Sequence, residues 1–80
     1  MNVTEQLTAF IVGPLSGGTA GAVDPDEDLI ERGLIDSLGI IELLSFIDDK
    51  FGVSLPPDEV VPENFRSVRA LAALIEAKRR

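Results

Sequence analysis

The sequence contains no cysteine, histidine, tryptophan or tyrosine, and its only aromatic residues are four phenylalanines. Without cysteine there is no disulfide framework, and without cysteine or histidine a zinc site is not expected. The missing cysteines suit a reducing compartment. Without histidine, cysteine or tyrosine, general acid–base chemistry would rest on carboxylates alone. We therefore expect a protein that is not an enzyme.

Basic residues are scarce, since seven Lys and Arg stand against 14 Asp and Glu and give a net charge of −7. An acidic surface argues against nucleic acid and anionic membranes as partners and favours basic patches on other proteins. Long apolar runs are also missing, because none approaches the roughly 20 residues that span a bilayer. The N-terminal segment lacks the basic region and apolar core of a signal peptide. We expect a monomer in the cytoplasm.

Apolar residues at helical spacing predict one all-α domain over residues 1–80. A first helix should start with a capping box formed by Asn2 and Glu5. It should end or be disrupted at Gly13-Pro14, because proline has no N–H donor and restricts the residue before it. Its expected inward stripe is Val3, Leu7, Phe10 and Ile11. Residues 16–22 have little to bury and should form a long mobile loop. The expected anchors of this loop are Leu29, Ile30, Leu34 and Ile35.

The second helix is expected over Ser37–Phe51, with Gly52 ending it. Spacings of three and four residues predict an inward stripe. This stripe is Leu38, Ile41, Leu44, Ile47 and Phe51, and it is widened by Ile40, Leu43 and Phe46. The residues left for solvent are Glu42, Ser45, Asp48, Asp49 and Lys50. Because that polar face is narrow, part of the apolar edge should stay exposed.

One short and one long helix are expected in the last third of the chain. Pro56-Pro57 forces an extended turn, and residues 58–61 can form only one short helical turn before Pro62. Ser67 is a suitable N-cap for the last helix. Its expected inward residues are Val68, Leu71, Leu74 and Ile75, and its closing bases are Lys78, Arg79 and Arg80. These bases complement the negative end of the helix. The pattern thus predicts three main helices and one short one.

Three segments suggest a ligand or catalytic motif without completing it. The acidic run 24–28 resembles a calcium loop, but Leu29 and Ile35 stand where the required glycine and bidentate acid should be. A solvated acidic loop is the better interpretation. The glycine-rich run 17–21 has neither a preceding strand nor a following Lys-Ser/Thr pair, which favours a flexible linker over a phosphate loop. Ser37 is not a hydrolase nucleophile elbow, because the chain has no histidine to act as base.

Asp36 and Ser37 stand where the second helix should begin. Both residue types cap helices, so N-capping alone is enough to explain them. The same position also favours a phosphate, because a helix N-terminus carries partial positive charge and free amide groups. If Ser37 takes part in chemistry, the reactive group must be supplied from outside. The two roles are compatible, and the residues alone leave both open.

The stretch from Leu34 to Leu44, continued by residues 51–56 and 62–68, resembles the phosphopantetheine attachment region of acyl and peptidyl carrier proteins. The resemblance implies a four-helix bundle with a long loop after the first helix. It also implies a covalent 4'-phosphopantetheine, moved from coenzyme A by a separate transferase to Ser37. Since this arm ends in a thiol that carries thioesters, the cofactor would bring the reactive atom that the chain lacks.

The resemblance further implies where partners make contact. Asp36 and Leu38 would be part of what the phosphopantetheinyl transferase reads. The candidates for docking partner enzymes are Ile40, Ile41, Glu42, Leu44 and Ser45. The partners would include a loading enzyme, either adenylating or acyltransferring, and downstream enzymes that use the acyl or aminoacyl group.

Gly39 departs from the fatty-acid carriers, in which an acidic residue usually follows the Ser-Leu pair. The pattern is closer to free-standing aminoacyl carriers, such as D-alanyl carrier proteins, and to carriers of natural-product pathways. The leading hypothesis is a free-standing carrier with phosphopantetheine on Ser37, which shuttles acyl or aminoacyl thioesters between biosynthetic enzymes. The alternative is an unmodified helical adaptor that binds proteins through the apolar edge of the second helix.

Overall fold

The computed structural model describes residues 2–15, 17–18 and 21–79. In this part of the chain the regular structure is helical throughout. Its elements are α1 (Val3–Phe10), η1 (Ile11–Leu15), α2 (Ser37–Phe51), η2 (Pro57–Glu59), α3 (Pro62–Phe65) and α4 (Val68–Lys78). The prediction of an all-α fold with three main helices and one short helix is confirmed. The mobile loop predicted over residues 16–22 falls partly on Ser16, Thr19 and Ala20, which lie outside the described residues.

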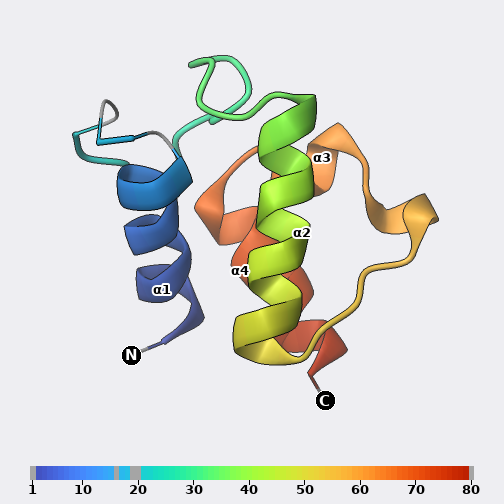
Figure 1. Ribbon diagram of the computed structural model, residues 1–80. Helices are drawn as coiled ribbons and strands as arrows, with labels where there is room; N and C mark the ends of the chain where they lie inside the picture. Colours follow the sequence, from blue (N-terminus) through green and yellow to red (C-terminus); the bar gives the residue numbers. More distant parts are fainter. Residues whose placement is uncertain (1, 16, 19–20, 80) are drawn as a thin grey trace.

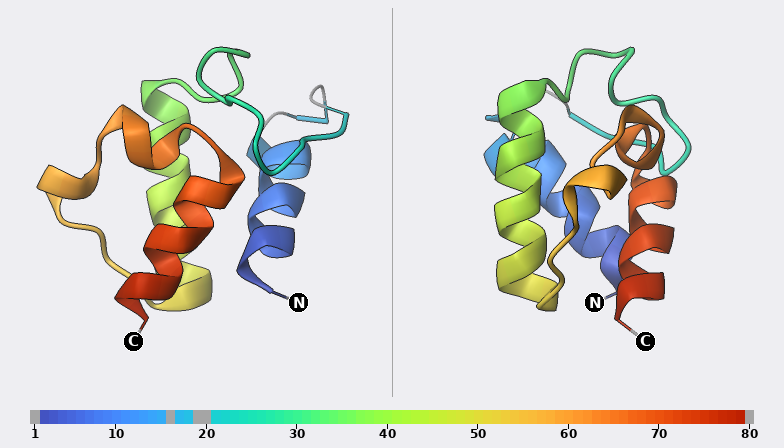
Figure 2. Two further views of the ribbon diagram at one scale, coloured as in Figure 1. Left: turned by 180° about the vertical axis from the view of Figure 1, so that it is seen from behind. Right: turned by 90° about the vertical axis from the view of Figure 1, so that its right-hand side faces the viewer.

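Helix α1 runs in the direction opposite to α2 and α4 (Figure 1), and the right-hand view of Figure 2 shows it inclined to both. Helix α1 packs on α4, and the two views of Figure 2 place the short α3 near the end of the molecule where α2 begins. The long connection from α1 to α2 crosses this same end. The start of α2 therefore lies at one end of the bundle, close to several connecting segments.

The hydrophobic core is built from all the main helices and from the connections between them. Phe65 of α3 is its largest fully buried side chain. The buried core residues are Val3, Leu7, Ile11, Val23, Leu29, Ile35, Leu43, Ile47, Val53, Phe65, Val68, Leu71, Ala72 and Ile75. Of the four predicted loop anchors, Leu29 and Ile35 are buried, and Ile30 and Leu34 are half-buried. The connection before α2 is thus held by the core at its predicted positions.

The first helix begins as predicted, since the Glu5 N–H donates to the Asn2 side chain at 2.8 Å. Val3, Leu7 and Ile11 are buried, while Phe10 is half-buried. The α-helical winding stops before Gly13-Pro14, but the chain continues as the π-helical turn η1 up to Leu15. Because Pro14 has no N–H to donate, regular α-helical hydrogen bonding cannot continue through it. The proline therefore disrupts the helix without ending it, and Leu15 still reaches the body of the protein.

Helix α2 has the predicted bounds, but its predicted inward stripe is only partly correct: Ile47 is buried as predicted, whereas Leu38 and Ile41 are not. Leu38 and Ile41 are 63% and 62% exposed, and the buried residues are Gly39, Leu43 and Ile47. Leu44 and Phe51 of the predicted stripe are half-buried. At 100° per residue, Leu38 and Ile41 lie among the polar residues of the helix, and the opposite side contains Leu43 and Ile47. The polar residues, rather than the apolar ones, mark how this helix is turned.

The short helical turn predicted over residues 58–61 is found as a 3₁₀ turn, whereas the short α-helix lies later in the chain. Residues 57–59 form the 3₁₀ turn η2, and the short α-helix is α3, which starts at Pro62. The prediction took Pro62 as the residue that stops a helix, whereas proline at the first helical position costs no hydrogen bond and favours a start. Helix α4 is capped by Ser67 as predicted, with the Ala70 N–H donating to the Ser67 hydroxyl at 3.1 Å. Its inward residues Val68, Leu71 and Ile75 are buried, and Leu74 is half-buried.

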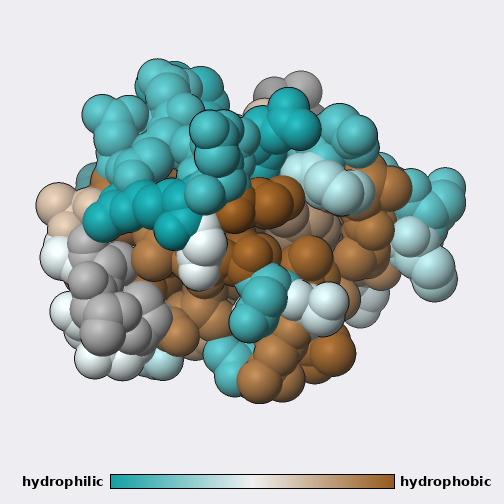
Figure 3. All heavy atoms as spheres, turned by 90° about the horizontal axis from the view of Figure 1, so that it is seen from above, coloured by the Kyte–Doolittle hydropathy of each residue, from teal (hydrophilic) through white to brown (hydrophobic). Residues whose placement is uncertain are grey.

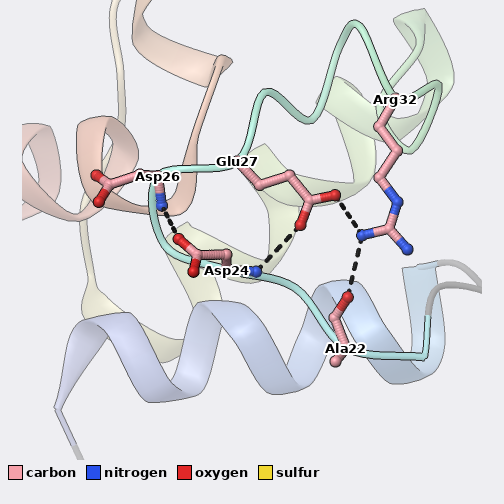
Figure 4. A network of polar contacts seen from close by, with 5 residues as sticks. All are labelled: Ala22, Asp24, Asp26, Glu27 and Arg32. Atoms are coloured by element: carbon pink, nitrogen blue, oxygen red, sulfur yellow. Dashed lines mark hydrogen bonds and ion pairs between the residues drawn. The ribbon is translucent and has the colours of Figure 1, made fainter.

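The acidic run before α2 folds on itself and on α4. The Asp24 side chain accepts from the Asp26 N–H at 2.9 Å, and the Glu27 carboxylate accepts from the Asp24 N–H at 3.2 Å and pairs with Arg32 at 2.5 Å (Figure 4). Asp26 also pairs with Arg69 of α4. The hydrogen bond from Arg69 lowers the pKa of Asp26 below its usual value. Asp24 and Asp26 are exposed, in agreement with the predicted solvated loop, and the run in addition forms local hydrogen bonds and surface ion pairs.

Backbone hydrogen bonds fix the same loop to the C-terminal helices. The Leu29 N–H donates to the Arg66 carbonyl at 2.6 Å, and the Arg69 N–H donates to the Pro25 carbonyl at 2.9 Å. Gly33, with φ of 81°, turns the chain toward α2 in a conformation that favours glycine. Among the described residues, no helix is long and apolar enough to cross a membrane.

Candidate functional site

The candidate site is the first turn of α2, where Asp36 caps the helix and Ser37 presents an exposed hydroxyl. Asp36 is the N-cap, and its side chain accepts a hydrogen bond from the Gly39 N–H at 2.8 Å. Ser37 is the first helical residue and is exposed. Within the described part of the chain, its hydroxyl has no hydrogen-bond partner. Since Asp36 does the capping, the Ser37 hydroxyl is available to react with an external group.

The position of Ser37 suits a phosphate ester. The first amide groups of a helix point outward, and the helix dipole places partial positive charge there. Asp36 uses one of these amides, that of Gly39, and the others at this end remain. An anion attached at Ser37 would therefore sit in a favourable field, as the sequence suggested.

Gly39 holds the first turn of α2 against the rest of the protein. It is buried, and a Cβ atom at this position would meet Leu15 Cδ1 at 3.8 Å, Ile35 Cγ2 at 3.9 Å and Asp36 Oδ1 at 3.4 Å. These are ordinary van der Waals distances, so a Cβ atom here would contact the neighbouring side chains without a clash. Leu15 is a contributor that sequence analysis missed, because Gly13-Pro14 suggested that the helix ended before it.

The outer side of α2 next to Ser37 carries the most exposed large apolar side chains. These are Leu38 and Ile41. Apolar surface is gathered at this end of the molecule and is bordered along one side by hydrophilic surface (Figure 3). A pocket at the start of α2 is lined by Leu15, Leu34 and Leu38 together with Asp36 and Glu42, and its surface is mostly polar. An apolar surface beside a reactive hydroxyl is suited to contact with another protein.

The remaining predicted docking residues divide into two groups. Glu42 and Ser45 are exposed beside Leu38 and Ile41, so the structure brings these four together on one face. Ile40 and Leu44 are half-buried and pack against the core. Within the described residues, no group of three or more His, Cys, Asp or Glu side chains could hold a metal ion.

A family described as "Phosphopantetheine attachment site" matches residues 15–75 of the chain. The chain is 34% identical to the "Aminoacyl carrier protein 2" of Bradyrhizobium diazoefficiens, with 94% of this chain and 84% of that protein covered. It is also 34% identical to the "D-alanyl carrier protein" of Lactococcus lactis subsp. cremoris, with 85% and 86% covered.

A solved structure titled "Crystal structure of FAD-dependent dehydrogenase" contains a similar chain. The two chains are 43% identical and superpose with a TM-score of 0.79, over 85% of this chain and 96% of that one. The matched chain is therefore of the same small size.

Proposed function

Because the chain belongs to the phosphopantetheine attachment family, whose members are carrier proteins with covalent 4'-phosphopantetheine, we propose that Ser37 bears this group. The observation that carries the proposal is the exposed Ser37 hydroxyl at the start of α2, which lies beside the cap formed by Asp36 and has no hydrogen-bond partner among the described residues. When bound, the group supplies a thiol that carries acyl or aminoacyl groups as thioesters. The chain itself supplies the hydroxyl, a favourable field for the phosphate, and surfaces for its partners.

The proposed docking surface consists of Leu38, Ile41, Glu42 and Ser45. Its support is their shared exposure on one side of α2, next to Ser37. When a partner covers exposed apolar side chains, the free energy of the complex falls by about 25 cal/mol per Å² of apolar surface buried. Asp36 and Leu38 would be read by the transferase, and Ile40 and Leu44 would border the contact. In this role the chain needs no catalytic residue of its own.

The proposed cargo is an aminoacyl group, which an adenylating enzyme would load. Support comes from the aminoacyl and D-alanyl carriers that the chain resembles over most of their length, and from Gly39 in place of an acidic residue. We place this role in the cytoplasm and expect a free-standing monomer.

One downstream partner is proposed from the solved structure with the similar chain. A flavin-dependent dehydrogenase would take two hydrogens from the cargo and reduce its FAD to FADH₂. Anaerobic mixing of the loaded chain with such an enzyme should bleach the flavin absorbance, whereas the Ser37→Ala chain should not. Equal bleaching by both chains, or none by either, would remove this partner.

The attachment proposal is tested by intact-mass spectrometry after incubation with coenzyme A and a broad-specificity phosphopantetheinyl transferase. Wild-type protein should gain the mass of one phosphopantetheine, and Ser37→Ala should gain nothing. Ser54→Ala is the matched control, because Ser54 is also exposed but lies beyond the opposite end of α2. A mass gain that persists in Ser37→Ala would refute the site, and no gain in wild type would refute the role.

A second candidate function, the unmodified adaptor, is favoured by the exposure of Leu38 and Ile41 alone. It predicts a stable complex that forms equally well with Ser37→Ala and wild-type chains, and that weakens in Ile41→Ser. Binding that depends on the attached arm would instead support the carrier.

A further inference from the structure

A groove lies between α1 and α2, on the side of α2 that faces α1. Its floor is the stacked pair Phe10 and Phe46, whose ring centroids are 4.2 Å apart at an interplanar angle of 17°. Two overlapping sections of the groove have volumes of about 310 and 420 Å³. These volumes are at the small end of the range for small-molecule pockets, about 300–1,000 Å³. The groove is therefore large enough for a group of amino-acid size.

This groove adjoins the pocket at the first turn of α2 at Glu42. Glu42 lines both the pocket at the start of the helix and the groove section that contains Phe10 and Phe46. Phe46 follows Ser37 by nine residues, which is about 13 Å along a helix. An extended phosphopantetheine arm is longer than that distance. A group at the end of an arm on Ser37 can thus reach the aromatic pair along one side of α2.

The charges of the groove distinguish between kinds of cargo. The section nearest Ser37 has Glu42 and Asp49 at its rim, with Ser45 between them along the helix. Lys50 lines only the other section, together with Gln6 and Ala9. Two carboxylates beside aromatic faces attract an ammonium group, by direct charge and by cation–π interaction. A fatty-acyl chain has no such group and would remain largely in contact with water in an open groove.

We propose that this groove receives the aminoacyl end of the arm, with the ammonium group near Glu42 and Asp49 and the amino-acid side chain on the Phe10–Phe46 pair. The proposal rests on the attachment at Ser37. It assigns α1 a role in holding cargo, in addition to its role in the fold. Glu42 and Ser45 lie beside the exposed Leu38 and Ile41 and also line the groove, so enzyme contact and cargo contact meet along this edge of α2.

The test compares amide chemical shifts of three isotopically labelled forms: the arm alone, the arm carrying phenylalanine in a stable amide linkage, and the arm carrying N-acetylphenylalanine. Phenylalanine should shift the amides of Ala9, Phe10, Phe46 and Asp49, with contacts from its ring to the Phe10 and Phe46 rings. Acetylation removes the ammonium and should reduce the bound population about two- to five-fold. Intact mass confirms that each form carries its group.

Charge variants address the same point without disturbing the aromatic pair. Glu42→Gln with Asp49→Asn should reproduce the effect of acetylation, whereas the matched control Asp58→Asn, an exposed acid in η2, should not. Shifts confined to residues 37–39 in fully loaded protein would overturn the groove and leave Ser37 as the attachment site. Shifts at Leu44, Ser54 and Leu55, which line a pocket on the other side of α2, would overturn it as well. Shifts that grow with protein concentration would indicate a second copy in the groove, and would also overturn the proposal.

Discussion

Replacing Leu43 or Ile41 with alanine tests the orientation of α2 directly. Both are large apolar residues in the middle of the same helix, two positions apart, but Leu43 is fully buried and Ile41 is 62% exposed. Removing a buried leucine side chain leaves a cavity and costs about 2–5 kcal/mol. A domain of 80 residues has a stability on the order of 5 kcal/mol. Leu43→Ala should therefore remove a large part of the stability of the fold.

Ile41→Ala should behave differently, although it removes a similar number of atoms. Exposed positions away from special contacts change the stability by less than about 0.5 kcal/mol. Alanine also has the higher helix propensity, which offsets part of the lost contacts. For a domain of this size, a cost of about 3 kcal/mol lowers the melting temperature by about 12–24 °C. The melting temperatures of Leu43→Ala and Ile41→Ala should differ by most of this interval of about 12–24 °C.

The measurement is urea unfolding followed by far-UV circular dichroism, together with thermal melting. The comparison holds if the slope of the free energy against urea stays equal in both variants, which shows that the same surface unfolds. Equal losses of stability in Leu43→Ala and Ile41→Ala would refute the orientation of α2 described above. Equal losses would mean that the side of α2 with Leu38 and Ile41 faces the core.

Further predictions concern the cap and the acidic loop. Asp36→Ala should cost about 1 kcal/mol in urea unfolding because the Gly39 N–H loses its acceptor, and Asp36→Asn should cost much less; equal costs would show that charge and not the cap matters. Asp26 should titrate below its usual carboxyl pKa in an NMR titration, and Arg69→Gln should bring that pKa back to its usual range. The sign follows from the lowered pKa: the stability from this pair is present above the unfolded carboxyl pKa of about 3.9 and is lost as the pH falls through the lower folded value. An unchanged pKa in Arg69→Gln would contradict this.

Local signals in the sequence were sufficient for the boundaries of the main helices. Asn2, Asp36 and Ser67 each start a helix in the structure, and each has a side-chain oxygen that accepts an N–H three residues later. Gly52, with φ of 67°, ends α2 where predicted. Capping depends on residues adjacent in the chain, so it can be read without knowing how the helices pack.

The inward face of α2 could not be obtained by counting apolar residues. The helix has apolar side chains on most of its circumference, so several stripes fit a spacing of three and four. The arc with Glu42, Ser45, Asp48 and Asp49 contained the necessary signal. Leu38 and Ile41 lie inside that arc, against the usual preference of large apolar residues for the core. These two exposed residues lie next to the candidate attachment site, where a docking partner would cover them.

The groove over Phe10 and Phe46 was not predictable for a different reason. It depends on how α1 lies against α2, and the π-helical turn η1 between α1 and the following loop sets where Pro14 and Leu15 lie. Sequence spacing gives the period of a helix but not the distance between two helices. Only the assembled bundle brings the two rings together.

The division of work between Asp36 and Ser37 has one more consequence. If the serine had been the cap, esterifying it would have broken a bond that starts the helix, and the modified and unmodified proteins would have differed in shape. With the carboxylate next door holding the amide, the hydroxyl can be converted while every backbone contact of the first turn is kept. The enzymes that attach the arm and the enzymes that use it would then contact the same backbone structure at the first turn of α2. They would distinguish the modified from the unmodified protein only by the attached group.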